Sequence, residues 1–255
     1  MTLEGWNYRK SHIITHPTGG LTNYQTKIRV YRTTGIDSGD TVYIGDKCLA
    51  DYGDIRFINS AGTELDYWME TNAGSYADFW VEIDSIETST NIYIYYGNSS
   101  ATTTSNGDTT FLFFDDFTTL DTSKWTVTGS PSISSGVCTI QSGSGLTSKS
   151  TYGVNYAIRS KVSLTSGVSG ALPSFGFGKY FDTTHICYLT YQGGNHLLES
   201  KSSTASGTTG FAYDTNYHIF DIVRHSTTLI QGYRDSIADT PITTNIATDT
   251  FAIIS

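Results

Sequence analysis

Short β-type segments recur through the first hundred residues, and turn residues separate them. Each segment is rich in β-branched and aromatic residues: WNYRKSHIIT, YQTKIRVYR, TVYIG, DIRFIN, ELDYWME, ADFWVEI and TNIYIYY. Between them stand HPTGG, TGIDSGD, NSAGTE and TNAGSY, whose glycines, asparagines and aspartates supply the backbone conformations of tight turns. About seven short strands joined in this way are typical of a β-sandwich or a jelly roll.

A strand followed by a polar stretch marks the end of this first set. In TNIYIYYGNSS, residues 90–100, isoleucine alternates with tyrosine. The strand is therefore covered on both faces, or packs one face into a core and turns tyrosines outward. Gly97 and Asn98 tolerate the positive φ values that end a strand. The next twelve residues, SSATTTSNGDTT, hold no large apolar side chain and indicate a boundary between two domains.

The length and composition agree with two domains. A chain of 255 residues is long enough for two cores. Glycine, serine, threonine and aromatic residues are abundant, and no stretch carries leucine, alanine, glutamate and lysine at a helical period. We therefore predict an all-β fold of two β-sandwich or jelly-roll domains in tandem, over residues 1–100 and 111–255, with a polar linker over 101–110.

The charge excludes several classes of function. The net charge of −9, with fifteen lysines and arginines that form no basic stripe, argues against nucleic acid and against an anionic membrane surface as partners. No apolar run approaches the length of a membrane span. The opening MTLEGWNYRK lacks the apolar core of a signal peptide, which indicates a piece of a larger protein or one that does not use the secretory route, such as a virion component.

The cysteines contain no metal or redox motif. Cys48, Cys138 and Cys187 are odd in number, and none stands in a C-x-x-C spacing. Buried thiols are the favoured interpretation, and a Cys138–Cys187 disulfide is the alternative.

The segments WNYRKSHIIT, GGLTNYQTKIRV, DIRFINSAGTELDYWME, ADFWVEI and IYIYYGN, in this order, resemble the domain of unknown function numbered 2341. The resemblance covers nearly all of residues 5–100. It implies a β-rich module of large archaeal, bacterial or viral surface proteins, often beside lectin-like domains, and no activity.

The ELDYWME segment resembles the acidic catalytic strand of laminarinase-type glycoside hydrolases, but its spacing differs. Glu64, Asp66 and Glu70 share a face of a regular strand, yet six residues span about 20 Å. Retaining glycosidases hold their carboxyl groups about 5 Å apart and inverting ones about 6.5–9.5 Å apart. We therefore do not expect catalysis here.

The second half resembles the opening of concanavalin-like jelly rolls of the laminarinase and laminin-G-like superfamily. The matching segments are FDDF, LDTSKW, GVCTI and YAIRSKV. The hydrolases of that superfamily need a pair of carboxylates, whereas this half contains a single glutamate, Glu199, and residues 166–198 contain only Asp182 as an acid. We therefore predict that the protein is not an enzyme and that the jelly roll binds sugars or proteins.

Alternation along the strands gives candidate ligand-binding residues. In NYAIRSKVSL, Tyr156, Ile158 and Val162 fall on one face, predicted as core, and Arg159 and Lys161 fall on the opposite, solvent face. In HICYLTYQGGNH the face of Tyr188 is the more polar one. Sugar sites combine a flat aromatic ring with a few hydrogen-bonding groups. The candidates, each of which could instead only pack the sheet, are Arg159, Tyr180, Tyr188 and Gln192.

Asp116 is the candidate metal ligand. Related jelly rolls often bind a structural calcium ion near their opening DDF strand, and hard oxygen ligands suit Ca²⁺. Asp115 and Asp116 point to opposite sides of a strand, so at most one of them is a ligand, and Asp116 is the choice. The alternative is an acid that only hydrogen-bonds backbone groups at a turn.

The chain's end, FAIIS, predicts a strand with an open edge. Related domains finish with a further strand, and without it one edge of a sheet is exposed. Either the natural protein continues and the second domain is truncated here, or a neighbouring subunit supplies the strand by β-augmentation.

Together these features predict a non-catalytic recognition or adhesion module of a larger surface protein, located outside the cell, on a cell surface or on a virion. The predicted partner is a glycan or surface polysaccharide. The alternative is a structural subunit of a virion, tail fibre or surface filament, whose partners are other copies or subunits of the assembly.

Overall fold

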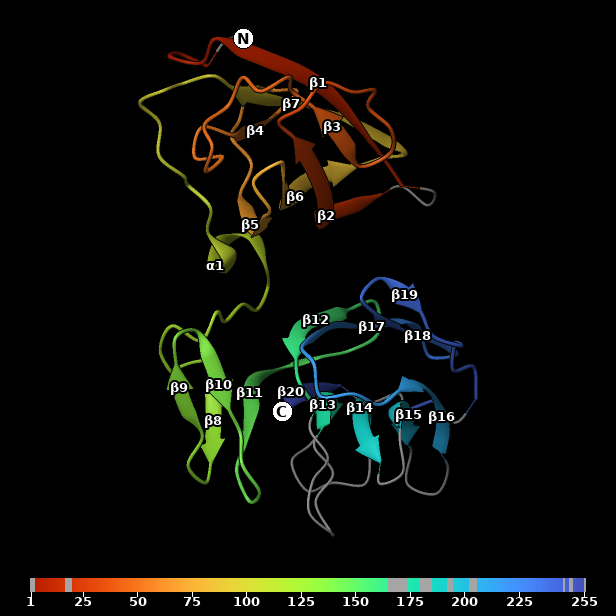
Figure 1. The fold of residues 1–255 in the computed structure, drawn as a ribbon. Helices are drawn as coiled ribbons and strands as arrows, with labels where there is room; N and C mark the ends of the chain where they lie inside the picture. The colour runs from red at the N-terminus through yellow and green to blue at the C-terminus, as the bar shows by residue number, and fades with distance from the viewer. Residues whose placement is uncertain are drawn as a thin grey trace. The chain divides into compact units, whose positions relative to one another are not determined.

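The structure is a computed structural model, and it describes residues 3–16, 20–164, 174–178, 185–191, 195–201, 206–244, 246–247 and 250–254. The chain divides into two compact units, Met1–Asp115 and Asp116–Ser255. Within the described residues nearly all regular structure is β-strand, and the one helix is α1 (Gly107–Thr110) (Figure 1). The predicted all-β fold is confirmed. No helix in this part of the chain has the length and apolarity needed to cross a membrane.

The first unit contains two sheets. A three-stranded sheet has the order β1-β7-β4, built from β1 (Tyr8–Thr15), β7 (Ser89–Tyr96) and β4 (Arg56–Asn59). A four-stranded sheet has the order β3-β2-β6-β5, built from β3 (Thr41–Tyr43), β2 (Leu21–Tyr31), β6 (Tyr76–Ile86) and β5 (Tyr67–Asn72). Neighbouring strands are antiparallel except β2 and β3. All seven strands fall on segments predicted from the sequence.

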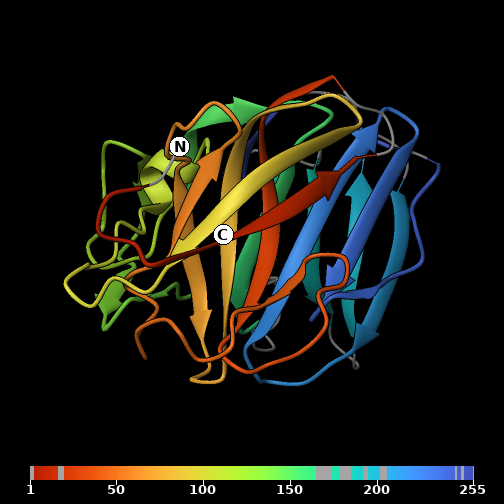
Figure 2. The ribbon, with the colours of Figure 1, turned by 90° about the horizontal axis from the view of Figure 1, so that it is seen from above.

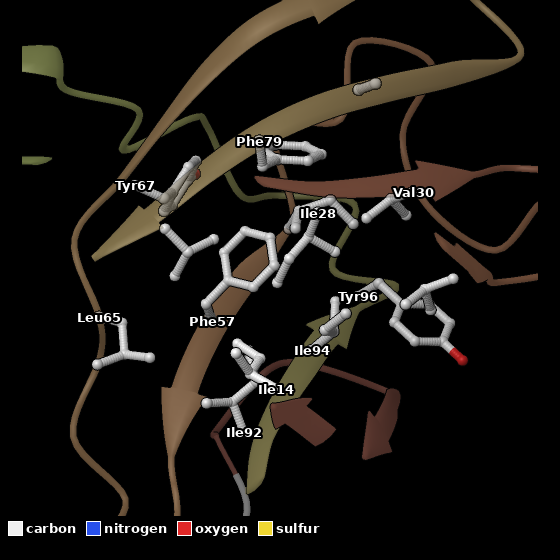
Figure 3. Close-up of a cluster of buried hydrophobic side chains, with 14 of the residues drawn as sticks. Ile14, Ile28, Val30, Phe57, Leu65, Tyr67, Phe79, Ile92, Ile94 and Tyr96 are labelled. Atoms are coloured by element: carbon white, nitrogen blue, oxygen red, sulfur yellow. The ribbon is translucent and has the colours of Figure 1, made fainter. Parts of the chain in front are cut away.

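The two sheets of the first unit share one core, drawn in Figure 3. Phe57 of β4 lies with its ring centroid 5.4 Å from those of both Tyr67 and Phe79, which belong to the other sheet. On β7, the alternating residues Ile92 and Ile94 are fully buried in this core. Tyr95, on the opposite face of β7, is buried as well, so the end of the strand is covered on both faces and its earlier part on one. The unit is sandwich-like, with one apolar face of each sheet turned to the other.

A buried carboxylate joins distant parts of this unit. Asp54, which is 1% exposed, accepts hydrogen bonds from the backbone N–H of Leu49 at 2.8 Å, of Gly97 at 2.6 Å and of Asn98 at 3.2 Å. Its own carbonyl accepts from the indole of Trp6 at 2.6 Å. These bonds hold the end of β7 and the loop before β4 together.

The segment predicted as a linker is bonded to the first unit. Arg56 donates to the carbonyl of Thr102 at 2.7 Å, and the Asn106 amide donates to the carbonyl of Tyr67 at 2.8 Å. After α1, Phe114 packs on Trp68 with ring centroids 5.0 Å apart. The small polar residues are therefore part of the first unit, which extends to Asp115.

The second unit contains a seven-stranded, a four-stranded and a two-stranded sheet among its described residues. The orders are β16-β15-β14-β13-β20-β11-β8, β12-β17-β18-β19 and β10-β9. The bounds of the strands are β8 (Trp125–Thr128), β9 (Ser132–Ser134), β10 (Val137–Thr139), β11 (Gly145–Tyr152), β12 (Ala157–Val162), β13 (Ser174–Gly178), β14 (His185–Tyr191), β15 (Asn195–Lys201), β16 (Ser206–Ala212), β17 (His218–Ser226), β18 (Leu229–Arg234), β19 (Ile237–Ala238) and β20 (Phe251–Ile254).

The two larger sheets of this unit pack face to face. Figure 2, seen from above, shows the blue strands of the four-stranded sheet lying over the cyan strands of the seven-stranded sheet. Tyr188 of β14 and Phe220 of β17 are both fully buried, with ring centroids 4.6 Å apart. A Cβ added to Gly232 of β18 would lie 2.3 Å from the Tyr188 hydroxyl, so glycine is required for this close approach.

The prediction of an open edge at the end of the chain is wrong. The strand β20 pairs on one side with β11, where Ile254 stands opposite Thr147, and on the other with β13, where Ile254 stands opposite Gly176. It is thus an inner strand of the seven-stranded sheet, and Phe251 is fully buried. Neither a missing strand nor β-augmentation is needed at this position.

We expect Asp54→Ala to destabilise the first unit by about 2–4 kcal/mol, because the substitution leaves buried N–H groups without an acceptor. Urea unfolding followed by tryptophan fluorescence measures the loss. Asp51→Ala is the matched control, because Asp51 is exposed and accepts only the local Gly53 N–H, at 3.0 Å, among its recorded bonds. Equal effects of the two substitutions would contradict the role given to Asp54.

Candidate functional site

The outer face of the four-stranded sheet carries one of the predicted ligand-binding residues. On β17, Phe220 and Ile222 are fully buried, so the alternating residue Asp221 points away from the core. The register places Arg159 of β12 opposite Asp221, and Asp221 opposite Tyr233 of β18. Tyr233 in turn stands opposite Ala238 of β19. We call Arg159, Asp221, Tyr233 and Ala238, which cross all four strands, the arginine row.

An ion pair occupies the middle of the arginine row. One guanidinium nitrogen of Arg159, Nη1, donates to both carboxylate oxygens of Asp221, at 2.8 and 2.7 Å. The side chains of Arg159 and Asp221 are 21% and 17% exposed, so water reaches the pair but does not surround it. Tyr233 is half-buried on the same face. Directly opposite residues of antiparallel strands hold their Cβ atoms about 4.5–5.5 Å apart, which sets the Tyr233 side chain next to the pair.

The arginine row combines the groups that recognise polyols. In an arginine–aspartate pair, the ion pair fixes the positions of the N–H donors and the carboxylate acceptors relative to each other. A neighbouring tyrosine adds an apolar ring with a hydroxyl group. Lys161, on the same face of β12, is exposed as predicted. The prediction for the inward face is confirmed for Ile158, which is buried, and wrong for Tyr156, which is 40% exposed.

The other ligand-binding candidates do not join the arginine row. Tyr188 is fully buried between the two sheets, so the prediction that its face of β14 is the outer one is wrong. Burial raises the pKa of the Tyr188 phenol, and its hydroxyl has no hydrogen-bond partner in the described structure. A ring in that position cannot stack on a sugar from solvent. Tyr180 and Gln192 lie outside the described residues.

Asp116 lies in a turn. It is exposed, and its Oδ1 accepts a hydrogen bond from the Thr118 backbone N–H at 2.9 Å, while the intervening Phe117 has a φ of 53°. Hydrogen bonds from Thr118 lower the pKa of Asp116. No group of three or more histidine, cysteine or acidic side chains suited to a metal occurs in the described parts of the chain. Asp116 alone does not make a calcium site, so the calcium ion stays a prediction, and a calorimetric Ca²⁺ titration checks it.

The acidic residues of ELDYWME do not form the regular row of carboxylates that the segment predicts for an ideal strand. Glu64 pairs with the buried Arg56 at 3.2 Å and is 45% exposed. The register of β5 against β6 shifts between Met69 and Thr71, at the position of Glu70. This irregularity breaks the regular alternation on which a shared face of the three acids depends.

The described cysteine side chains show no metal or redox site. Cys48 is half-buried, and burial raises its pKa to about 12, so the group stays a protonated thiol near neutral pH. The Cys187 side chain lies outside the described atoms, so the alternative Cys138–Cys187 disulfide remains a prediction.

A second surface of interest lies on the first unit. Tyr43, Tyr31 and Tyr76, from β3, β2 and β6, form a tyrosine row on the outer face of the four-stranded sheet. The rings of Tyr31 and Tyr43 are stacked at 4.8 Å, and those of Tyr31 and Tyr76 are 5.3 Å apart. The guanidinium of Arg29, bonded to Asp78 at 2.6 and 2.8 Å, lies 4.2 Å from the Tyr76 ring centroid. These contacts occupy ring faces, so the row offers mainly edges and hydroxyl groups.

Sequence reasoning missed Asp221 and Tyr233. They stand in HIFDIVRH and LIQGYRDS, whose apolar residues do not all lie on one face. Phe220 is buried, whereas Ile219 lies on the half-buried face of Asp221. Alternation therefore does not by itself assign either residue to an outer face. Their place beside Arg159 depends on the pairing of β12 with β17, which the sequence does not show.

The comparison with family models finds one match. The family described as a domain of unknown function (DUF2341) matches residues 51–128. The match supports the resemblance of the N-terminal half, although it begins later and extends past residue 100. It contains β4 to β7 and the segment after them that is bonded to the first unit. No curated protein matches the chain. The concanavalin-like resemblance of the second half stays a prediction.

We expect the Arg159–Asp221 pair to show a coupling free energy of about 1 kcal/mol in a double-mutant cycle, because one guanidinium nitrogen bonds both carboxylate oxygens and the pair is partly shielded from water. The cycle uses Arg159→Leu, Asp221→Leu and the double variant, with stability measured by urea unfolding. The matched cycle of Lys161→Leu with Asp221→Leu should give a coupling near zero. A negligible coupling for Arg159 would mean that the pair is not held in solution.

Proposed function

We propose that this protein is a non-catalytic recognition or adhesion module of a larger extracellular, cell-surface or virion protein, and that carbohydrate is its ligand class. The partner is a glycan or surface polysaccharide, bound on the arginine row. The observation that carries the proposal is the partly exposed Arg159–Asp221 pair beside Tyr233 on an outer sheet face.

Three features support this assignment. The pair already has the donor and acceptor geometry that sugar hydroxyls need, so little ordering is required on binding. The row crosses β12, β17, β18 and β19, and sites on strands are held more precisely than sites on loops. The second unit contains one glutamate, Glu199, and over residues 166–198 Asp182 is the one acid, which argues against the pair of carboxylates that hydrolases of the resembled superfamily need there.

Glycan binding tests the proposal directly. A glycan array and pull-downs on insoluble polysaccharides, at millimolar sugar, should show binding, and Tyr233→Ala or Arg159→Ala should weaken it about tenfold, the effect of losing roughly 1.4 kcal/mol. Tyr217→Ala is the control, because Tyr217 is an exposed tyrosine of the same unit outside the arginine row.

Two results would contradict this proposal. An array and pull-downs that stay empty at millimolar sugar would remove carbohydrate as the ligand class. Release of reducing sugar from laminarin or a related glucan would overturn the non-catalytic assignment.

The tyrosine row favours a second candidate, a structural subunit of a virion, tail fibre or surface filament. Tyrosine and arginine are enriched in protein–protein interfaces, and one outer sheet face carries Tyr43, Tyr31, Tyr76 and Arg29 together. Mass in solution distinguishes the two candidates. A monomer whose melting temperature rises with a glycan supports the recognition module, whereas defined trimers or fibres that Tyr31→Ala dissociates support the structural subunit.

A further inference from the structure

His218, at the start of β17, lies between two carboxylates from different segments. Its Nε2 is 2.8 Å from Oδ1 of Asp214, which belongs to the segment between β16 and β17. Its Nδ1 is 2.5 Å from Oδ2 of Asp235, which follows β18. We call His218, Asp214 and Asp235 the His218 clamp.

The clamp requires a proton on each ring nitrogen. An ionised carboxylate only accepts hydrogen bonds, and a neutral imidazole carries a single N–H. Both short contacts are therefore hydrogen bonds only when His218 is an imidazolium. When the second proton leaves, a nitrogen lone pair faces a carboxylate, and that contact becomes repulsive.

Each carboxylate of the clamp also holds backbone groups. Asp214 accepts the Asn216 N–H at 2.8 Å, and Asp235 accepts the Ile219 N–H at 3.0 Å. Asp235 and Ser236 are the two central residues of the hairpin between β18 and β19, and their φ values of 51° and 68° are those of a type I′ turn. His218 adds a contact from β17 to this turn.

Among the described residues, the other charged and titratable groups around the clamp are Arg234, His196 and Tyr213. Arg234 Nη1 lies 3.8 Å from Asp214 and also donates to the Ala212 carbonyl at 2.7 Å. The ring of His196, fully buried on β15, lies 6.3 Å from that of His218 and 5.3 Å from that of Tyr213. Burial lowers the pKa of His196, so it is neutral near pH 7. His218 is therefore the group of this cluster that changes charge near neutral pH.

We propose that the His218 clamp is a proton-dependent latch that fastens the segment at Asp214 and the turn at Asp235 to β17 while His218 is protonated and releases one of them when it is not. The segment at Asp214 carries Tyr217, which is 54% exposed, so release changes the presentation of an aromatic side chain on the surface. The latch is argued from other residues than the proposed glycan site and does not rest on it.

The direction of the pH dependence follows from the pKa values. Burial lowers the pKa of His218, but the hydrogen bonds and charges of Asp214 and Asp235 outweigh burial and raise it above its ordinary 6.5. The latch therefore contributes its full stability below about pH 6.5 and loses it as the pH rises through the folded-state pKa. The pKa values of both aspartates are lowered from 3.8, so the contribution is also lost as the pH falls through their folded-state values. The latch is closed between these limits.

Hydrogen exchange combined with a histidine titration tests the latch on the full chain. NMR follows the His218 ring while exchange of the Asn216, Ile219 and Asp235 amides is measured between about pH 5.5 and 8.5, corrected for intrinsic exchange. Protection factors of these amides should fall with the titration of His218, by about tenfold for each unit by which its pKa exceeds 6.5. In His218→Gln, protection should be low and independent of pH. His225→Gln, in an exposed histidine of the same strand, should behave as the wild type.

A second variant tests the latch even if His218→Gln does not fold. Asp214→Asn removes one carboxylate and keeps its shape, so the His218 titration and the loss of protection should both move to lower pH. Three results would each overturn the latch. The first is protection factors that stay constant while His218 titrates, and the second is a His218 pKa at or below about 6.5. The third is a transition in Asp214→Asn at the same pH as in the wild type.

Discussion

The carboxylate of Asp54 holds together parts of the first unit that lie far apart in the sequence. It gathers N–H groups from the loop before β4 and from the end of β7, and two residues later Arg56 reaches the carbonyl of Thr102. The second unit has a comparable buried charge. The guanidinium of Arg224 lies 5.6 Å from the Phe177 ring centroid and 5.2 Å from that of Phe251, and donates to the carbonyl of Tyr152. In both units a buried charged side chain forms hydrogen bonds to backbone groups of distant segments. These bonds are directional, whereas apolar packing between the strands is not.

The strands and inward faces of the first unit could be predicted because they depend on local pattern. Isoleucine and tyrosine alternate along β7 with the period of a strand, and the buried set follows directly. The attachment of residues 101–110 could not be predicted, since it uses backbone carbonyls and amides such as those of Thr102 and Asn106. Every residue has a backbone carbonyl, and every residue except proline has a backbone N–H, so composition does not reveal which of these groups are bonded.

The candidate site shows the same limit. Arg159 stands out by alternation, but its partner Asp221 lies 62 residues further along the chain and is placed by the pairing of two strands. The prediction of an outer position for Tyr188 was wrong for a related reason. Both faces of HICYLTY carry apolar and aromatic residues, so the pattern gives the period and leaves the direction of the core undecided. Tyrosine hydroxyl groups that are buried without a hydrogen-bond partner, as in Tyr188, are uncommon. For this reason the sequence favoured an outer position for this tyrosine.

The central position of β20 has a consequence for the order in which the second unit is made. Ribosomes release a chain from its N-terminus, at about 5–20 residues per second. The Ile253 amide bonds to the Ser148 hydroxyl across 105 residues, and β20 alone joins β11 to β13. Until β20 emerges, the described strands of this sheet form two separate pieces, each with an unpaired edge at the position that β20 later fills. Chaperones that cover exposed strand edges would therefore act on this unit before β20 is made, whereas the first unit contains the strands of both its sheets and can close while the second is still being translated.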